Sequence, residues 1–324
     1  MEPRMFVQTM VLLLKSAPTL DEIEAVLKDH PVIARMEEGM DSLDICGPAV
    51  VMDYHKLDGG KFVVDVVDKP WPDSLDYDNS ESPVHQAWLA GHFGAYLLPE
   101  SLERAKEQCW RWPEAKEAVE EATAFLRLRT TFLLDSKTEP NEDNWIPADF
   151  DPAAELELLN EVIAELLELP QVIGYFNPQG EVLRDKELFL ETAEICRENE
   201  IPPLDLWSNV RLYRIDDDWV MMDTVGNCQL ETMDVEACFH ADSYDMNDVD
   251  QLLRLVTMYL LEDPEFEDSE SFEDENGVTW KISIEIDSLC DPPRDVVRLI
   301  PDDGRTPPDL SSDSDDADGE EEDE

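Results

Sequence analysis

Short apolar runs recur along the first half of the chain, and polar or turn-forming residues bound each of them. Such runs predict buried β-strands, whereas apolar residues spaced three and four apart predict helices. The predicted strands of this half are residues 6–15, 32–36, 49–54, 61–67 and 125–134. The predicted helices are residues 20–29, 84–90, 101–108 and 114–122. The first half is therefore predicted to contain both helices and strands.

Local signals fix several helix starts and turns. Thr19 and Glu22 have the spacing of a capping box, in which each side chain binds the backbone amide of the other residue. Asp151 precedes Pro152 in the order that favours a helix start, and Asn247 is the expected cap of a later helix. Hairpin turns are expected at residues 59–60, 216–218 and 276–277.

The second half begins with a helix from residue 152 that has one apolar and one acidic face. Glu157, Glu161 and Glu165 follow one another at a spacing of four residues, with no Lys between them. Like charges at this spacing destabilise an isolated helix, so burial of the apolar face must hold the helix. That face carries Leu156, Leu159, Ile163 and Leu166. The remaining predicted elements are strands 172–176, 210–215, 219–223 and 278–286 and helices 185–199 and 248–261.

The irregular order of strands and helices predicts an α+β fold with largely antiparallel sheets packed against helices. Residues 136–150 are rich in Pro, Asn and Asp, which is typical of a linker. We therefore expect two related or successive α+β subdomains, at residues 1–135 and 151–300. Residues 301–324 contain mainly Pro, Ser and acidic residues and are expected to form a disordered acidic tail.

Charge restricts the partners that can approach this chain. It contains 79 Asp and Glu against 24 Lys and Arg, for a net charge of −55. The tail accounts for −11 and residues 1–300 for −44, so the folded part is itself acidic. Nucleic acids and anionic membranes are excluded as expected partners because both require Lys and Arg to neutralise phosphates. A basic protein partner fits, and adaptation of an ordinary domain to high salt is an alternative explanation.

The expected location is the cytoplasm. The six cysteines lie far apart without a CxxC pair, which is typical of reduced thiols. The apolar run of residues 6–14 ends at Lys15 without a cleavage pattern, so we interpret it as a first strand rather than a signal peptide. No apolar stretch reaches the roughly 20 residues needed to span a bilayer.

Histidine and cysteine offer two candidate sites. His85 and His92 are seven residues apart, but no third metal ligand has a recognisable spacing, so structural roles are favoured. Cys238 and His240, with Cys228 upstream, resemble half of a zinc site or a nucleophile and base. On a strand, residues two apart lie roughly 6–7 Å apart, too far for the hydrogen bond that a nucleophilic Cys needs. A buried Cys beside a partly exposed His is the favoured interpretation.

Arginine side chains and the acidic tail offer two further candidate binding sites. The arginines could build an anion pocket, but internal pairing with carboxylates is favoured. The arginines concerned are Arg127, Arg129, Arg211 and Arg214. In the tail, Ser314, Asp316 and Asp318 precede Gly319 as in a calcium loop, yet the required Glu falls past the last residue. No high-affinity metal, no cofactor and no catalytic residue is therefore assigned, and phosphate-loop and nucleophile-elbow motifs are absent.

Several longer motifs resemble a known family. They are residues 91–94 (GHFG), 111–115 (RWPEA), 175–183 (YFNPQGEVL), 202–215 (PPLDLWSNVRLYRI), 219–226 (WVMMDTVG) and 234–239 (DVEACF). Together they resemble the uncharacterised bacterial family called domain of unknown function 4261, over residues 6–300. The resemblance implies a bacterial cytoplasmic protein and assigns no catalytic residue.

The sequence thus favours a non-enzymatic binding or regulatory protein that engages a basic protein partner. The alternative is an enzyme, for example a hydrolase, with an unrecognised site near His92 or the hairpin Asn209–Thr224. Polar side chains with shifted pKa values, gathered in one concave pocket, would favour the enzyme hypothesis.

Overall fold

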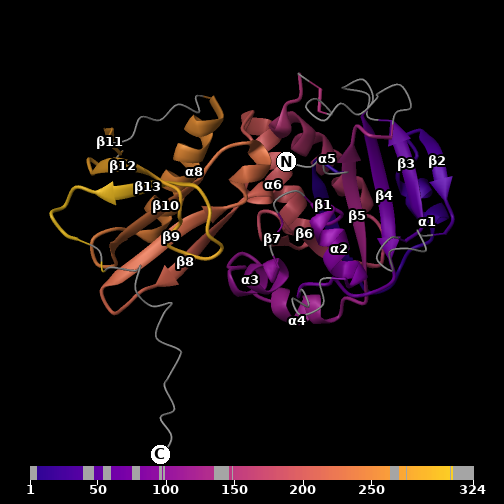
Figure 1. Ribbon diagram of the computed structural model, residues 1–324, viewed down its shortest axis with the longest axis horizontal. Coiled ribbons are helices and arrows are strands. Elements are labelled where there is room, and N and C mark those ends of the chain that lie inside the picture. Colours follow the sequence, from indigo (N-terminus) through magenta and orange to yellow (C-terminus); the bar gives the residue numbers. More distant parts are fainter. Residues whose placement is uncertain are drawn as a thin grey trace, which may run out of the picture. The chain divides into compact units, whose positions relative to one another are not determined.

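The computed structural model divides the chain into two compact units (Figure 1). Unit 1 contains Met1–Asn209 and Cys228–Glu231, and unit 2 contains Val210–Asn227 and Thr232–Glu324. The structure describes residues 6–38, 47–53, 60–74, 81–94, 97, 99–134, 146–147, 149–262, 270–274, 276–306 and 308. Most of the predicted acidic tail, including the calcium-like positions, therefore lies outside the described residues.

Unit 1 is built on a seven-stranded sheet with the order β2-β3-β4-β5-β1-β6-β7. Every neighbouring pair in it is antiparallel. Strands β1 and β5 have every residue buried, as expected for the centre of a sheet covered on both faces. The strands are β1 (Thr9–Leu14), β2 (Val32–Met36), β3 (Ala49–Asp53), β4 (Lys61–Val67), β5 (Ala124–Thr131), β6 (Val172–Asn177) and β7 (Val182–Arg184).

Helices cover both faces of this sheet. Side chains of α2, α3 and α4 join Val11, Phe125 and Phe176 in one apolar cluster on the first face. Helices α1, α5 and α6 contact strands β3, β1 and β6, and Tyr175 of β6 packs on Phe189 of α6. The helices are α1 (Leu20–Val26), α2 (Pro83–Leu89), α3 (Ser101–Glu107), α4 (Ala115–Glu120), α5 (Pro152–Leu166), α6 (Lys186–Asn199) and α7 (Leu204–Trp207).

The observed division of the chain differs from the predicted one. Strand β6 pairs with β1, so the sheet of unit 1 continues past the predicted linker at 136–150 and the chain divides after Asn209. Most of that linker lies outside the described residues. Local composition can indicate a turn-rich segment, but it carries no information on which distant strand completes a sheet.

Unit 2 contains a six-stranded sheet with the order β11-β12-β13-β10-β9-β8. Strands β10 and β13 pair in parallel, whereas β9 with β10, β11 with β12 and β12 with β13 pair in antiparallel fashion. The predicted α+β class with largely antiparallel sheets is confirmed. The strands are β8 (Asn209–Arg214), β9 (Trp219–Val225), β10 (Asp234–His240), β11 (Ser271–Glu273), β12 (Thr279–Glu285) and β13 (Val296–Pro301).

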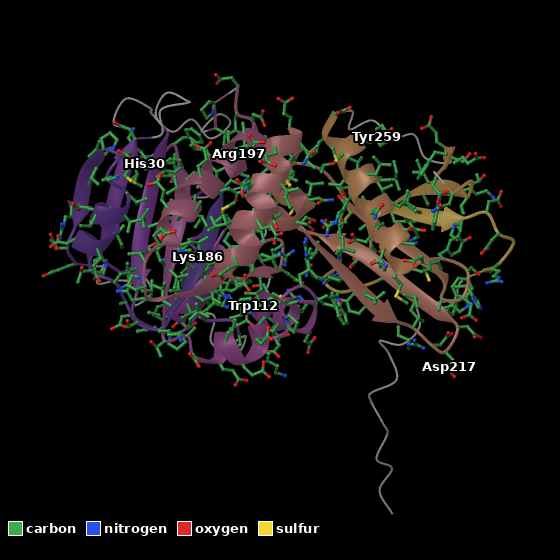
Figure 2. The ribbon with its side chains drawn as sticks, turned by 180° about the vertical axis from the view of Figure 1, so that it is seen from behind. His30, Trp112, Lys186, Arg197, Asp217 and Tyr259 are labelled. Carbon is green, nitrogen blue, oxygen red and sulfur yellow. The ribbon has the colours of Figure 1, made fainter. Side chains whose placement is uncertain are left out.

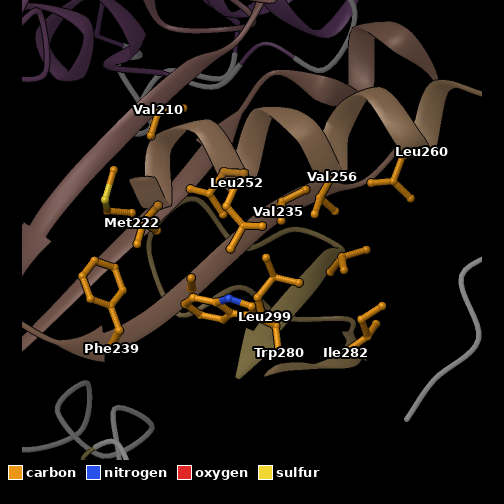
Figure 3. Close-up of a cluster of buried hydrophobic side chains, with 14 of the residues drawn as sticks. Val210, Met222, Val235, Phe239, Leu252, Val256, Leu260, Trp280, Ile282 and Leu299 are labelled. Carbon is orange, nitrogen blue, oxygen red and sulfur yellow. The ribbon is translucent and has the colours of Figure 1, made fainter. Parts of the chain in front are cut away.

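One long helix, α8 (Met246–Glu262), packs its apolar face on the sheet of unit 2 (Figure 3). Val235 and Phe239 of β10 point toward it, together with Trp280 and Leu299. Because side chains alternate along a strand, Glu236 and the other intervening residues of β10 lie on the opposite face. That second face is polar, and it carries the charged cluster described below.

One predicted helix cap is corrected and another is confirmed. Helix α8 begins at Met246, and the Asp245 side chain accepts the Asn247 amide at 2.8 Å, so Asp245 rather than Asn247 caps the helix. The capping box of Thr19 and Glu22 is confirmed. The elements that periodicity did not predict are β7, β10, β11, β13, α7 and a 3-10 turn at Asn227–Leu230.

Candidate functional site

A buried charged cluster lies in the sheet of unit 1. Asp65 of β4 accepts two hydrogen bonds from Arg127, from Nε to Oδ1 at 3.1 Å and from Nη2 to Oδ2 at 2.5 Å. Arg129 Nη2 lies 2.9 Å from Oδ1 of the same carboxylate. Register places Asp65 opposite Arg127 on β5, so the pairing follows directly from the strand alignment. Burial alone raises the pKa of Asp65, but the two guanidinium groups outweigh it and hold that pKa below its ordinary value.

His92 closes this cluster through its backbone. Its carbonyl accepts hydrogen bonds from Arg127 at 3.1 Å and Arg129 at 3.3 Å. Burial and the two guanidinium groups lower the pKa of the His92 imidazole to about 4, so the ring is neutral at pH 7. The ring packs edge-on against Phe6 at a centroid distance of 5.8 Å. These contacts give His92 a structural role.

His85 and His92 do not share a helical face. Helix α2 ends at Leu89, and Gly91 adopts a φ of 73°, which turns the chain away before His92. Within the described residues, no group of three or more His, Cys, Asp and Glu side chains is arranged to hold a metal ion.

The motif at residues 177–181 builds a buried turn of unit 1. The Asn177 side-chain oxygen accepts the amides of Gln179 and Gly180, each at 3.1 Å, and its Nδ2 donates to Gln229 Oε1 at 2.9 Å. A Cβ on Gly180 would lie 1.8 Å from the Trp207 carbonyl oxygen, so only glycine fits. This motif is therefore explained by packing.

A second charged cluster lies on the polar face of unit 2. Asp223 of β9 accepts hydrogen bonds from Arg211 of β8, at 2.9 Å to Oδ1 and 2.5 Å to Oδ2. Arg294, from the segment between β12 and β13, donates to Asp223 Oδ2 at 2.6 Å and to Asp234 Oδ2 at 2.8 Å. Asp234 in turn accepts the Thr224 hydroxyl at 3.0 Å. Polar residues of the predicted hairpin Asn209–Thr224 are thus brought together, but they bind one another.

Burial lowers the reactivity of the two cysteines on this face. Burial, followed by the nearby Glu236 carboxylate, raises the pKa of the Cys238 thiol to about 12. Burial and Asp223 raise the pKa of Cys290 to about 12 as well. Both thiols are therefore protonated at pH 7, and a protonated thiol is a weak nucleophile. Cys238 is buried and His240 is partly exposed, which confirms the favoured interpretation of this pair.

The predicted internal pairing of the arginines is confirmed for Arg127, Arg129 and Arg211, while Arg214 is exposed. Sequence reasoning did not identify Arg294, because a single Arg in an irregular segment carries no periodic signal. It also did not select Asp65, since 79 acidic residues offer many equivalent candidates.

The comparisons with known proteins assign no activity. No curated protein and no solved structure matches this chain. No helix among the described residues is long and apolar enough to cross a membrane. One family does match, over the part of the chain from β9 to β13 that contributes Asp223, Asp234 and Arg294 to the unit 2 cluster. Residues 223–300 match the family described as "Domain of unknown function (DUF4261)", which confirms for that segment the resemblance noted in the sequence motifs.

Proposed function

We propose that this protein is a non-enzymatic binding or regulatory protein whose partner presents a basic surface. The observation that carries the proposal is the net charge of −55 and its distribution. Among the described residues, the buried acids outnumber the buried arginines by only two, so almost all of the negative excess belongs to the rest of the chain. The buried arginines are 127, 129, 184 and 211, and the buried acids are Asp65, Glu155, Glu181, Asp223, Asp234 and Glu236.

The same geometry gives less support to a hydrolase. The His92 ring is buried and neutral, and both oxygens of Asp223 accept from arginine side chains. Catalytic acids and bases must reach the substrate proton, and the burial of the His92 ring and the arginine contacts of Asp223 oppose such access. Binding through surface carboxylates requires none of these buried groups.

Affinity capture with the intact protein tests the proposal. Lysate of the source organism is applied at about 0.05 M and about 0.5 M salt, because salt screens exposed charges beyond roughly one Debye length. We expect a basic protein that is retained at low salt and released at high salt, and that binds the purified chain at a defined stoichiometry. Recovery of no salt-sensitive basic protein, or binding without saturation, would contradict the proposal.

A further inference from the structure

A groove of about 620 Å3 runs between α5 and α6 of unit 1. Its volume lies within the range of about 300–1,000 Å3 that is typical of ligand sites. Leu190 and Ala193 of α6 and Ile201 beyond its end give it an apolar lining. Ile201 is 42% exposed, so apolar surface there is open to a partner. Figure 2 labels Lys186 and Arg197, which mark the beginning and the last turn of α6.

Carboxylates border this apolar lining. Glu157 and Glu161 of α5 are exposed and lie one helical turn apart, and Glu194 and Glu200 approach from the side of α6. Arg197 also lines the groove, and its guanidinium lies 3.7 Å from the Glu194 carboxylate. The four carboxylates therefore favour a cationic ligand with an apolar face.

Asn160 supplies an independent observation that points to a ligand. Its side chain lines the groove and is only 6% exposed. Neither its Oδ1 nor its Nδ2 has a hydrogen-bond partner among the described residues. Leaving buried donors and acceptors unpaired costs free energy, so such groups normally have a partner or an ordered water. A ligand group that both donates and accepts would fill this role.

Resting on the proposed function, we propose that this groove binds an amphipathic basic helix of the partner protein. The apolar face of that helix packs on Leu190 and Ala193. Its Lys or Arg side chains, four residues apart, match the one-turn spacing of Glu157 and Glu161. A polar side chain of the ligand, such as Gln, pairs with Asn160. Helices that bind in a groove between helices use this combination of apolar anchors and flanking charge.

The first test is calorimetric titration of the intact protein with a designed peptide. The peptide has about 18 residues, roughly five helical turns, with Leu on one face and Lys, Arg and one Gln on the other. A peptide of identical composition in scrambled order is the control. We expect 1:1 binding, and roughly tenfold weaker binding of the scrambled peptide because its apolar face is lost. Equal affinities for the two peptides would contradict binding through an apolar helix face in the groove.

The second test separates the groove from general acidity. The groove variant carries Glu157→Gln, Glu161→Gln, Glu194→Gln and Glu200→Gln. The matched control carries the same charge change at exposed acids of unit 2: Asp217→Asn, Asp242→Asn, Glu262→Gln and Asp295→Asn. We expect the groove variant to bind the designed peptide roughly tenfold more weakly, because each lost carboxylate costs about as much as an exposed ion pair. The control variant should change the affinity for the peptide by less than about twofold.

Asn160→Leu provides a readout that a purely structural role would not give. Removing an unpaired amide from the apolar face of α5 should leave thermal stability unchanged or higher, while peptide affinity falls about fivefold. Lower stability with unchanged affinity would assign Asn160 to the fold and overturn its role in binding.

The outcomes separate this inference from the proposed function. If a captured basic partner binds but both charge variants weaken it equally, the binding function stands and the groove assignment is wrong. If the intact protein binds neither a captured basic protein nor the designed peptide, the proposed function itself is wrong.

Discussion

The two units bury similar charged clusters, but the second arginine of each cluster comes from a different kind of segment. In each, an aspartate on a strand pairs with an arginine of a neighbouring strand and with a second arginine. For Asp65 the second arginine is Arg129, on a strand of the same sheet. For Asp223 it is Arg294, from the irregular segment between β12 and β13.

This difference assigns the two clusters different structural roles. In unit 1, strand register brings the three charged side chains together and the His92 carbonyl accepts from both arginines, so the cluster is centred on the sheet itself. In unit 2, Arg294 donates to Asp223 and Asp234, and the Leu289 amide donates to Glu236 at 2.9 Å. There the charges hold an irregular segment against the sheet. We therefore expect removal of a charge to destabilise all of unit 1 but to loosen only part of unit 2.

Asp65→Asn should give the largest effect. It leaves Arg127 and Arg129 buried without a counter-charge, which typically costs about 3–5 kcal/mol. Urea denaturation measures the free energy of unfolding, with Asp68→Asn as the control because Asp68 is exposed. A loss below about 1 kcal/mol would show that the paired charges of unit 1 do not hold its sheet.

Glu155→Gln should change how stability depends on pH. Glu155 is a buried carboxyl that pairs with no arginine among the described residues, and burial raises its pKa to about 8, with the Thr130 hydroxyl opposing the shift. The native state therefore keeps a proton that the unfolded state loses near the ordinary glutamate pKa of 4.5. Stability should fall as pH rises through the window from about 4.5 to about 8, by at most about 1.4 kcal/mol per pH unit.

Urea denaturation of wild type and the Gln variant at several pH values measures this dependence. The variant should lack this decline, so the difference between the two free energies of unfolding should change steadily with pH across the window. Parallel curves would show that Glu155 does not retain its proton in the native state.

Arg294→Met should give a smaller and more local effect. It removes the donors to Asp223 and Asp234 but leaves Arg211 on Asp223, so we expect a loss of about 1–3 kcal/mol. Hydrogen exchange should accelerate at the amides of residues 286–295 and remain unchanged in β1 and β5. Unchanged exchange in 286–295 would contradict the role assigned to Arg294.

Much of the secondary structure could be predicted because it depends on local signals. The buried strands β1 and β4 appear as apolar runs, and the caps at Thr19 and Asp151 follow from side-chain chemistry. Strand β10 lacks the continuous apolar run that predicts the other strands, but the alternation of polar residues such as Glu236 with apolar ones is the pattern of a half-buried strand and could have identified it. The pairing of β6 with β1 joins residues far apart in the chain, which no local pattern reports.

The candidate groove was harder to predict than the fold. The acidic face of α5 was visible in the sequence, but its neighbour α6 is set by tertiary packing. One signal was available: Asn160 interrupts the apolar face of α5, four residues after Leu156 and three before Ile163. A polar residue at such a position requires a partner, and only the structure shows that none of the described residues supplies one.

The most direct test is to titrate the groove variant and the matched unit 2 control side by side with the amphipathic basic peptide. Both variants lose the same charge, so their comparison reports the position of the acids rather than their number. We predict that the groove variant binds roughly tenfold more weakly than the control. Equal affinities would show that acidity alone governs binding, and that unit 1 contains no dedicated site for a basic helix.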